Sequence, residues 1–188
     1  MHFVYIFDLD DTLMPTSTLF TQPMAQYFLG RMNRSDLASM ELTYRRVIPQ
    51  DPVLIQSLMA LTGPKLLFTN GSRAHGYFSM QALGISSLFM GQFDANSSDA
   101  LKPHEKVYAL VEHFVEQHPT ISSGVFQPLV FFDDQVVNLK TAKTRGWITV
   151  WICNGSNMPV EKWNFIDFTF TNIHHALHFF QQLEQKTR

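Results

Sequence analysis

Five of the sixteen acidic residues directly follow two apolar segments of the chain. Asp8, Asp10 and Asp11 come after the run FVYIF, and Asp133 and Asp134 come after the run LVFF. In an open α/β sheet the ligand site lies beyond the carboxyl ends of the strands, so neighbouring strands would bring these carboxylates together. Like charges held this close require a cation, and clustered carboxylate oxygens suit Mg²⁺. The alternative is that each Asp only caps a helix or makes a turn.

Two further segments have residue types that bind phosphate groups. Thr69, Asn70 and Gly71 follow the run LLF, where a hydroxyl and backbone amides before a helix are typical of an anion site. Lys102 stands next to Pro103 at the start of another expected helix. Each segment is weak evidence alone, because TNG also makes ordinary turns. Together with the acids they supply a nucleophile, a metal site, a hydroxyl and a cation, which phosphoryl transfer requires.

Positioning these residues requires alternating strands and helices. Continuous apolar runs are typical of parallel strands that are covered on both faces. The expected strands are residues 2–7, 65–68, 128–132, 147–152 and 168–170. The expected helices are residues 52–61, 74–83, 103–115, 136–145 and 173–183. This alternation predicts an α/β fold with a doubly wound, Rossmann-like parallel sheet.

One segment departs from this alternation. Residues 14–50 have no strand pattern, but residues 22–32 and 36–47 have the periodicity of amphipathic helices, the second with Ser35 as its expected N-cap. We therefore expect a small helical cap, residues 14–50, inserted after the first strand of a core domain that comprises residues 1–13 and 51–188. Four arginines of this cap either contact an anionic substrate or solvate its outer faces. They are Arg31, Arg34, Arg45 and Arg46.

Composition excludes several classes of protein. Of the 188 residues, 45% are hydrophobic and 16% are charged, which excludes intrinsic disorder. The net charge of −2 gives no global attraction to nucleic acid or to a membrane surface. We find no signal-peptide pattern and no apolar run long enough to cross a membrane, and we expect the single cysteine, Cys153, to be buried. The chain is expected to be cytoplasmic and to bind a small phosphorylated metabolite, with no nucleic acid polymer and no membrane as partner.

The motifs described above occur in the order found in the haloacid dehalogenase (HAD) superfamily, and the chain resembles that superfamily. They are DLDDT at residues 8–12, Thr69, Lys102 and the pair Asp133 and Asp134. The segments KLLFTNGSRAHGYFSMQALGI, LKPHEKVY and FFDDQVVNLKTAKTRGW look most like its pyrimidine 5′-nucleotidase-like branch. The resemblance covers residues 1–13 and 52–152, and it implies a HAD-like fold.

The resemblance implies aspartyl-phosphate chemistry. Asp8 would attack phosphorus and form the covalent intermediate. Asp10 would protonate the leaving oxygen and then activate water for the second step. A hydrolytic dehalogenase of this superfamily expels halide, which requires no proton donor, so Asp10 favours a phosphatase.

The resemblance also implies how metal and substrate are bound. Mg²⁺ would be bound by the backbone carbonyl of Asp10 and by carboxylates from two strand ends. These carboxylates are those of Asp8, Asp133 and, directly or through water, Asp134. Thr69 and Lys102 would bind the phosphoryl oxygens, with help from Asn70.

Two features differ from the nucleotidase-like branch. Gln135 stands where the branch commonly has Ser, and the cap is shorter than the caps that supply base recognition. We predict a Mg²⁺-dependent phosphomonoesterase that acts on small phosphorylated metabolites, with nucleoside monophosphates as the first substrates to test. The open alternatives are a phosphatase for a bulkier target, a phosphosugar mutase and a non-catalytic binding module. His75 is expected to be structural, because the aspartates already supply the acid and base.

Overall fold

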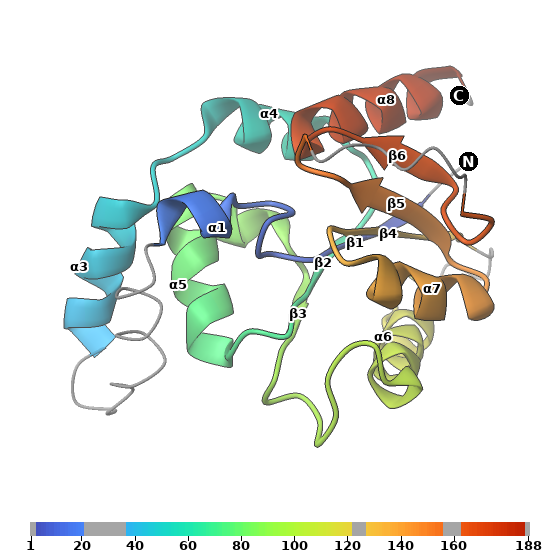
Figure 1. Ribbon diagram of the computed structural model, residues 1–188, viewed down its shortest axis with the longest axis horizontal. Coiled ribbons are helices and arrows are strands. Elements are labelled where there is room, and N and C mark those ends of the chain that lie inside the picture. The colour runs from blue at the N-terminus through green and yellow to red at the C-terminus, as the bar shows by residue number, and fades with distance from the viewer. Residues whose placement is uncertain (1–2, 21–36, 122–126, 156–162, 187–188) are drawn as a thin grey trace.

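The computed structural model describes residues 3–20, 37–121, 127–155 and 163–186. The expected helix at residues 22–32 and the expected N-cap Ser35 lie outside these ranges. Six parallel strands form one sheet with the order β3-β2-β1-β4-β5-β6 (Figure 1). They are β1 Val4–Phe7, β2 Lys65–Phe68, β3 Gly91–Phe93, β4 Leu129–Asp133, β5 Ile148–Ile152 and β6 Phe168–Phe170. The doubly wound α/β prediction is confirmed.

Helices cover both faces of the sheet (Figure 1). They are α4 Pro52–Ala60, α5 Arg73–Leu83, α6 Glu105–Gln117, α7 Val136–Thr144 and α8 Ile173–Lys186, with the short 3-10 helix η2 Ser86–Leu88. Successive strand residues point to opposite faces, so Tyr5 and Phe7 pack with α4, α5 and α8. Val4 and Ile6 pack with α6 and α7 on the other face. The strands are therefore buried on both sides, as their continuous apolar runs predict.

Strand β3 is absent from the sequence prediction. Its three residues, GQF, have neither an apolar run nor an alternation, and the strand lies at the edge of the sheet. A Cβ at Gly91 would lie 3.3 Å from side-chain atoms of both Leu66 and Phe114, so glycine allows close packing there. This packing depends on distant residues, which local periodicity does not report.

Helix ends follow the capping residues. Asp51 and Ser72 accept hydrogen bonds from backbone amides as the N-caps of α4 and α5, and Gly84 ends α5 with a φ of 78°. The helix expected from residue 103 instead begins at Glu105, because the side chain of His104 accepts a hydrogen bond from the Lys106 amide as the N-cap. Pro103 therefore belongs to the preceding turn, and its peptide bond with Lys102 is cis.

Besides α4, two helices lie between β1 and β2 in the described residues, α1 Thr16–Leu19 and α3 Leu37–Val47. Helix α3 corresponds to the second helix expected in the cap and packs beside α5 (Figure 1). Tyr44 and Ile48 are buried in the hydrophobic cluster that also contains Tyr5 and Phe7, on the face of the sheet that α4, α5 and α8 cover. Arg45 is half exposed and pairs with Glu41 on the helix surface. The division into a core domain and a cap at residues 14–50 stays a prediction.

A buried polar link joins the central strand to α8. The hydroxyl of Tyr5 donates a hydrogen bond of 2.8 Å to Glu184 Oε1, and the Thr62 amide donates one of 3.0 Å to Glu184 Oε2. Both Tyr5 and Glu184 are buried. The carboxylate therefore depends on protein donors in place of water.

Removing the Tyr5 hydroxyl should destabilise the fold. We expect Tyr5→Phe to lower the free energy of unfolding by about 1–3 kcal/mol, because it removes one donor from a buried carboxylate. Urea denaturation followed by far-UV circular dichroism measures the change. Tyr77→Phe is the matched control, since Tyr77 is 50% exposed, and it should change stability by less than about 0.5 kcal/mol. Equal effects of the two variants would contradict the role assigned to the buried link.

In the described ranges, no helix is long and apolar enough to cross a membrane. Cys153 is buried, as expected. It packs with the residues on the α6 and α7 face of the sheet, where its surroundings are apolar.

Candidate active site

Three of the five carboxylates singled out in the sequence meet at the carboxyl ends of strands β1 and β4. Strands β1 and β4 are neighbours, with Phe7 paired to Phe132, so Asp8 and Asp133 lie side by side at their carboxyl ends. One oxygen each from Asp8, Asp133 and Asp134 lie within 4.8 Å of one another. The expectation that the two acidic segments converge is therefore confirmed.

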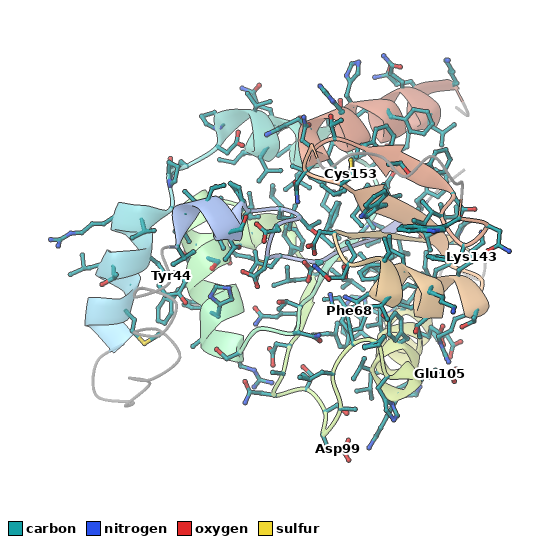
Figure 2. All side chains as sticks on the ribbon, in the orientation of Figure 1. Tyr44, Phe68, Asp99, Glu105, Lys143 and Cys153 are labelled. Carbon is teal, nitrogen blue, oxygen red and sulfur yellow. The ribbon has the colours of Figure 1, made fainter. Side chains whose placement is uncertain are left out.

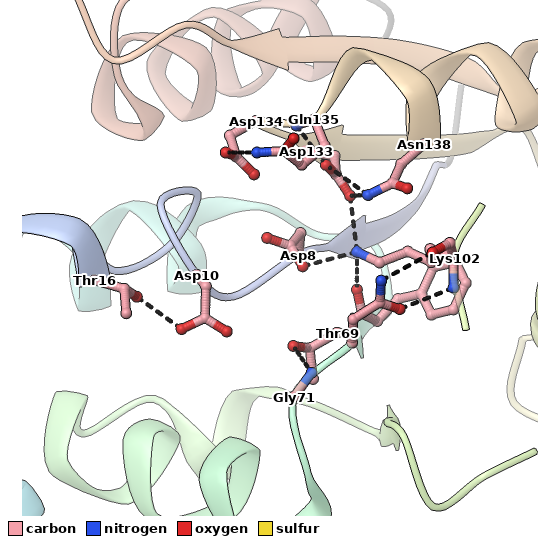
Figure 3. A network of polar contacts seen from close by, with 12 residues as sticks. Asp8, Asp10, Thr16, Thr69, Gly71, Lys102, Asp133, Asp134, Gln135 and Asn138 are labelled. Atoms are coloured by element: carbon pink, nitrogen blue, oxygen red, sulfur yellow. Dashed lines mark hydrogen bonds and ion pairs between the residues drawn. The ribbon is translucent and has the colours of Figure 1, made fainter. Parts of the chain in front are cut away.

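Lys102 lies between two of these carboxylates (Figure 3). Its Nζ donates hydrogen bonds to Asp8 Oδ1 at 2.7 Å and to Asp133 Oδ2 at 2.8 Å. A third bond of 2.8 Å goes to the backbone carbonyl of Phe68, and the side chain is 1% exposed. The ammonium group also lies 5.1 Å from the ring centroid of Phe68, within cation–π range. All three protons of the ammonium are therefore used inside the protein.

Asn70 fixes the backbone of Lys102. Its side-chain amide donates to the Lys102 carbonyl at 2.9 Å, and its side-chain oxygen accepts from the Lys102 amide at 2.8 Å. The amide group of Asn70 is thus fully engaged with the turn that presents the lysine. The expected role of Asn70 in substrate binding stays a prediction, and in this structure its side chain positions Lys102.

Thr69 and Gly71 form a compact turn at the end of β2. The Gly71 amide donates to Thr69 Oγ1 at 2.9 Å, and Thr69 is buried. A Cβ on residue 71 would lie 2.8 Å from the ring of His75 and 3.2 Å from Thr69 Oγ1. Glycine at position 71 therefore leaves the space that the side chains of His75 and Thr69 occupy beside the backbone.

Asp133 is oriented by Asn138, which the sequence prediction left out, and by the backbone of Gln135. Asn138 Nδ2 donates to both oxygens of Asp133, at 3.1 and 3.0 Å, and the Gln135 amide donates to Oδ1 at 2.7 Å. Asn138 is buried on α7, one helical turn after the acidic pair. An amide at that spacing, on a helix that begins beside two aspartates, is the signal that could have identified it.

Asp10 lies apart from the other carboxylates. Its Oδ1 accepts hydrogen bonds from Thr16 Oγ1 at 2.7 Å and contacts His75 Nε2 at 2.8 Å. Its carboxylate is outside the group of three that could bind a metal ion. A metal bond from Asp10, which the resemblance assigns to its backbone carbonyl, stays a prediction.

The crowding of charges shifts several pKa values. Burial raises the pKa of Asp8 to about 8; Lys102 opposes this rise, and Asp133 adds to it. Burial also raises the pKa of Asp134 to about 6, again with a contribution from Asp133. Burial acts to lower the pKa of Lys102, but the two carboxylates outweigh it and the net shift is upward. One ammonium group therefore does not balance the negative charge of the cluster.

This charge excess is what a divalent cation would neutralise. Three carboxylates with one oxygen each inside a small volume are a hard-oxygen donor set of the kind that Mg²⁺ prefers. The pKa values of Asp8 and Asp134 are raised first by burial and then by the charge of Asp133, and a bound cation would oppose both effects. The residues therefore fit a Mg²⁺ ion.

Mg²⁺ binding should strengthen as pH rises, because the ion competes with protons on Asp8 and Asp134. Since their folded pKa values are above the ordinary 3.8, the metal-free fold loses stability as pH rises from about 4 to about 8. We expect Mg²⁺ to bind at least about tenfold more tightly at about pH 8.5 than at about pH 6.5. Isothermal titration calorimetry measures both affinities. The Asp8→Asn variant should show a weaker pH dependence, and equal affinities at the two pH values would refute the expectation.

Comparisons with known proteins agree with the fold. No family model matches the chain, and no curated protein matches it. Solved structures do match. The L-2-haloacid dehalogenase from Xanthobacter autotrophicus, with chloropropionic acid covalently bound, has a TM-score of 0.64 and 16% identity, with 96% of this chain and 99% of that chain covered.

Two further neighbours have different descriptions. A HAD-hydrolase from Bacillus subtilis bound to magnesium has a TM-score of 0.65 and 12% identity, with 95% of this chain and 98% of that chain covered. A protein described as a beta-phosphoglucomutase from Thermotoga maritima has a TM-score of 0.65 and 14% identity, with 97% and 99% covered. The chain therefore has a HAD-like fold, and these neighbours do not single out the pyrimidine nucleotidase branch.

Proposed function

We propose that this protein is a Mg²⁺-dependent phosphomonoesterase that acts through an aspartyl phosphate on Asp8. The main support for this proposal is the position of Lys102. Its ammonium group contacts Asp8 and Asp133, and the carboxylate of Asp134 lies beside them. Such a cation neutralises phosphoryl oxygens close to the attacking carboxylate. The proposed substrates are small phosphorylated metabolites, with nucleoside monophosphates as the first candidates.

The first step forms a bond between an Asp8 oxygen and phosphorus while the bond from phosphorus to the ester oxygen breaks. Lys102 orients Asp8 and supplies positive charge close to the phosphoryl group, and Thr69 would bind a phosphoryl oxygen. Asp10 donates a proton to the leaving alcohol. Asp8, Asp133 and Asp134 would hold Mg²⁺, which supplies charge neutralisation at the phosphoryl group when bound.

The second step releases inorganic phosphate. Asp10, now ionised, accepts a proton from water as the water oxygen attacks phosphorus. Burial acts to raise the pKa of Asp10, but the hydrogen bonds from His75 and Thr16 outweigh burial and leave it below its ordinary value. The ionised carboxylate suits the base role in this step, whereas the acid role in the first step uses the protonated form of Asp10. The bond between phosphorus and Asp8 breaks, and the free carboxylate returns.

A hydrolytic dehalogenase is the competing activity, because haloacid dehalogenases are among the structural neighbours. Asp10 favours the phosphatase, since loss of halide requires no proton donor. The carboxylate cluster favours it as well, because a halide-releasing site does not require a divalent cation. A mutase remains an outcome of the test.

A panel assay tests the proposal. Purified protein is incubated with phosphate esters, including nucleoside monophosphates, in Mg²⁺ and in EDTA, and phosphate release is compared with that of Asp8→Asn. Chloride release from 2-chloropropionate is measured in parallel. Phosphate release that requires both Mg²⁺ and Asp8 supports the proposal. Chloride release alone would identify a dehalogenase, and isomerised sugar phosphate without free phosphate would identify a mutase.

Asp10→Asn should discriminate between esters by their leaving groups. A poor leaving group such as an alkyl alcohol requires a proton, whereas p-nitrophenolate departs without one. We expect kcat/KM for an alkyl phosphate to fall by about 10²–10⁴-fold, and kcat/KM for p-nitrophenyl phosphate by much less. Steady-state kinetics on both esters measures the ratio. Equal losses would show that Asp10 does not act as the acid in the first step.

A further inference from the structure

A chain of hydrogen bonds connects Asp10 to helix α3. His75 Nε2 lies 2.8 Å from Asp10 Oδ1, and His75 Nδ1 lies 2.8 Å from the hydroxyl of Tyr44. Tyr44 belongs to α3 and projects toward α5, the helix that carries His75 (Figure 2). The three side chains therefore link the segment after β1 to two helices.

The direction of these bonds follows from the chemistry of the groups. An ionised carboxylate only accepts, so His75 Nε2 donates to Asp10. In a neutral imidazole the other nitrogen then accepts, so the hydroxyl of Tyr44 donates to His75 Nδ1. Tyr44 thus fixes the tautomer that Asp10 requires, as the partner of one ring nitrogen commonly does.

Both side-chain donors act on the same oxygen of Asp10. Thr16 Oγ1 donates to Oδ1, the oxygen that His75 also contacts. Among the described residues, no hydrogen bond to Oδ2 is found, and this oxygen lies on the side that faces Asp8 and Thr69 (Figure 3). Oδ2 can therefore carry or accept a proton while Oδ1 keeps its two donors.

Contacts with neighbouring residues fix the position of the His75 ring. The Ser72 side chain accepts a hydrogen bond from the His75 amide at the first turn of α5. Gly71 permits the ring to lie where a Cβ would come within 2.8 Å of it. The rings of Phe20 and Tyr44 pack against His75, with centroids at 6.3 and 5.7 Å. The ring is thus held by contacts on several sides.

We propose that His75 is a positioning residue for the acid and base Asp10, and that Tyr44 supports it by fixing its tautomer. This inference rests on the proposed phosphatase function. His75 holds Oδ1, so that Oδ2 faces the position of the leaving oxygen. It goes beyond the expectation that His75 is structural, because its ring contacts the carboxylate that would carry the proton.

The test compares kcat/KM for an alkyl phosphate and for p-nitrophenyl phosphate, because this constant reports formation of the aspartyl phosphate. His75→Leu should lower the value for the alkyl ester by about 10–100-fold and that for the aryl ester by less than about threefold. His75→Gln keeps an N–H donor and should restore the alkyl value to within about threefold of the wild type. Tyr44→Phe should give a loss in the same direction that is smaller than that of His75→Leu. His113→Leu, at an exposed position outside the site, should leave both values unchanged.

The outcomes separate the two proposals. A wild type that hydrolyses both esters, with a His75→Leu variant that loses equal factors on both, overturns the role of His75 and leaves the phosphatase proposal standing. Failure of His75→Gln to restore the alkyl value also overturns it. A wild type that hydrolyses neither ester overturns the phosphatase proposal and the inference with it.

Discussion

Asp8→Asn should abolish phosphate release, with a loss in kcat of at least about 10⁴-fold. The amide has nearly the same shape as the carboxylate, but it cannot attack phosphorus. Burial and Asp133 raise the pKa of Asp8, so ionised Asp8 destabilises the metal-free fold near neutral pH. We therefore expect the Tm of Asp8→Asn in EDTA to equal or exceed that of the wild type. Phosphate release and thermal denaturation measure the two effects.

A matched control separates loss of the nucleophile from loss of charge. Asp99→Asn also removes one carboxylate, but Asp99 is exposed and pairs with Lys106 on the surface. It should retain activity within about twofold of the wild type and leave the free energy of unfolding essentially unchanged. A tenfold loss of activity corresponds to a rise of about 1.4 kcal/mol in the activation free energy. If Asp8→Asn lost no more than this, Asp8 would not be the nucleophile.

Lys102→Met should produce the largest loss of stability among the variants considered. Methionine has a similar shape but no charge, so Asp8 and Asp133 would face each other without the ammonium that contacts both. Breaking a buried ion pair from one side costs about 3–5 kcal/mol. Because the unpaired carboxylates then bind protons more readily in the folded state, part of this loss should be recovered as pH falls from about 8 to about 6. Urea denaturation at the two pH values measures both terms.

Lys106→Met is the control for Lys102→Met. Lys106 also pairs with an aspartate, but both side chains are more than half exposed, at 54% and 76%. Exposed pairs contribute about 0–1 kcal/mol, so this variant should be close to the wild type. A loss below about 1 kcal/mol for Lys102→Met would contradict the assignment of Lys102 as the counter-ion of the buried cluster.

The parts of the fold that could be predicted from sequence are those with a local signature. Long apolar runs, helix caps such as Ser72 and the αL position at Gly84 identified most elements close to their observed bounds. Strand β3 could not be predicted in this way, because its sequence GQF is not an apolar run, unlike that around β6, the three-residue strand at the other side of the sheet. Its formation depends on packing of Gly91 against Leu66 and Phe114.

The site residues also differ in how far they could be predicted from the sequence. The carboxylate cluster could be predicted, because position at a strand end determines where a side chain lies in a parallel sheet. The partners of these residues are brought together by the fold instead. Asn138 reaches Asp133 from a helix, and Tyr44 reaches His75 from a segment 31 residues away in the chain. The first pairing spans five residues and has the local signal described above, whereas the second does not follow from the residue type or spacing of one segment.

The central place of β1 in the sheet has a consequence for the order of synthesis. This strand is made first, yet both of its neighbours, β2 and β4, come later in the chain. Lys102 follows Asp8 by 94 residues, and Asp133 comes later still. During translation the apolar strand VYIF is therefore synthesised before either of its partners, and until they follow it is an unpaired apolar segment of the kind that is prone to aggregate. A nascent chain that ends before β4 has Asp8 but lacks Asp133, so the carboxylate cluster cannot assemble until β4 has been made.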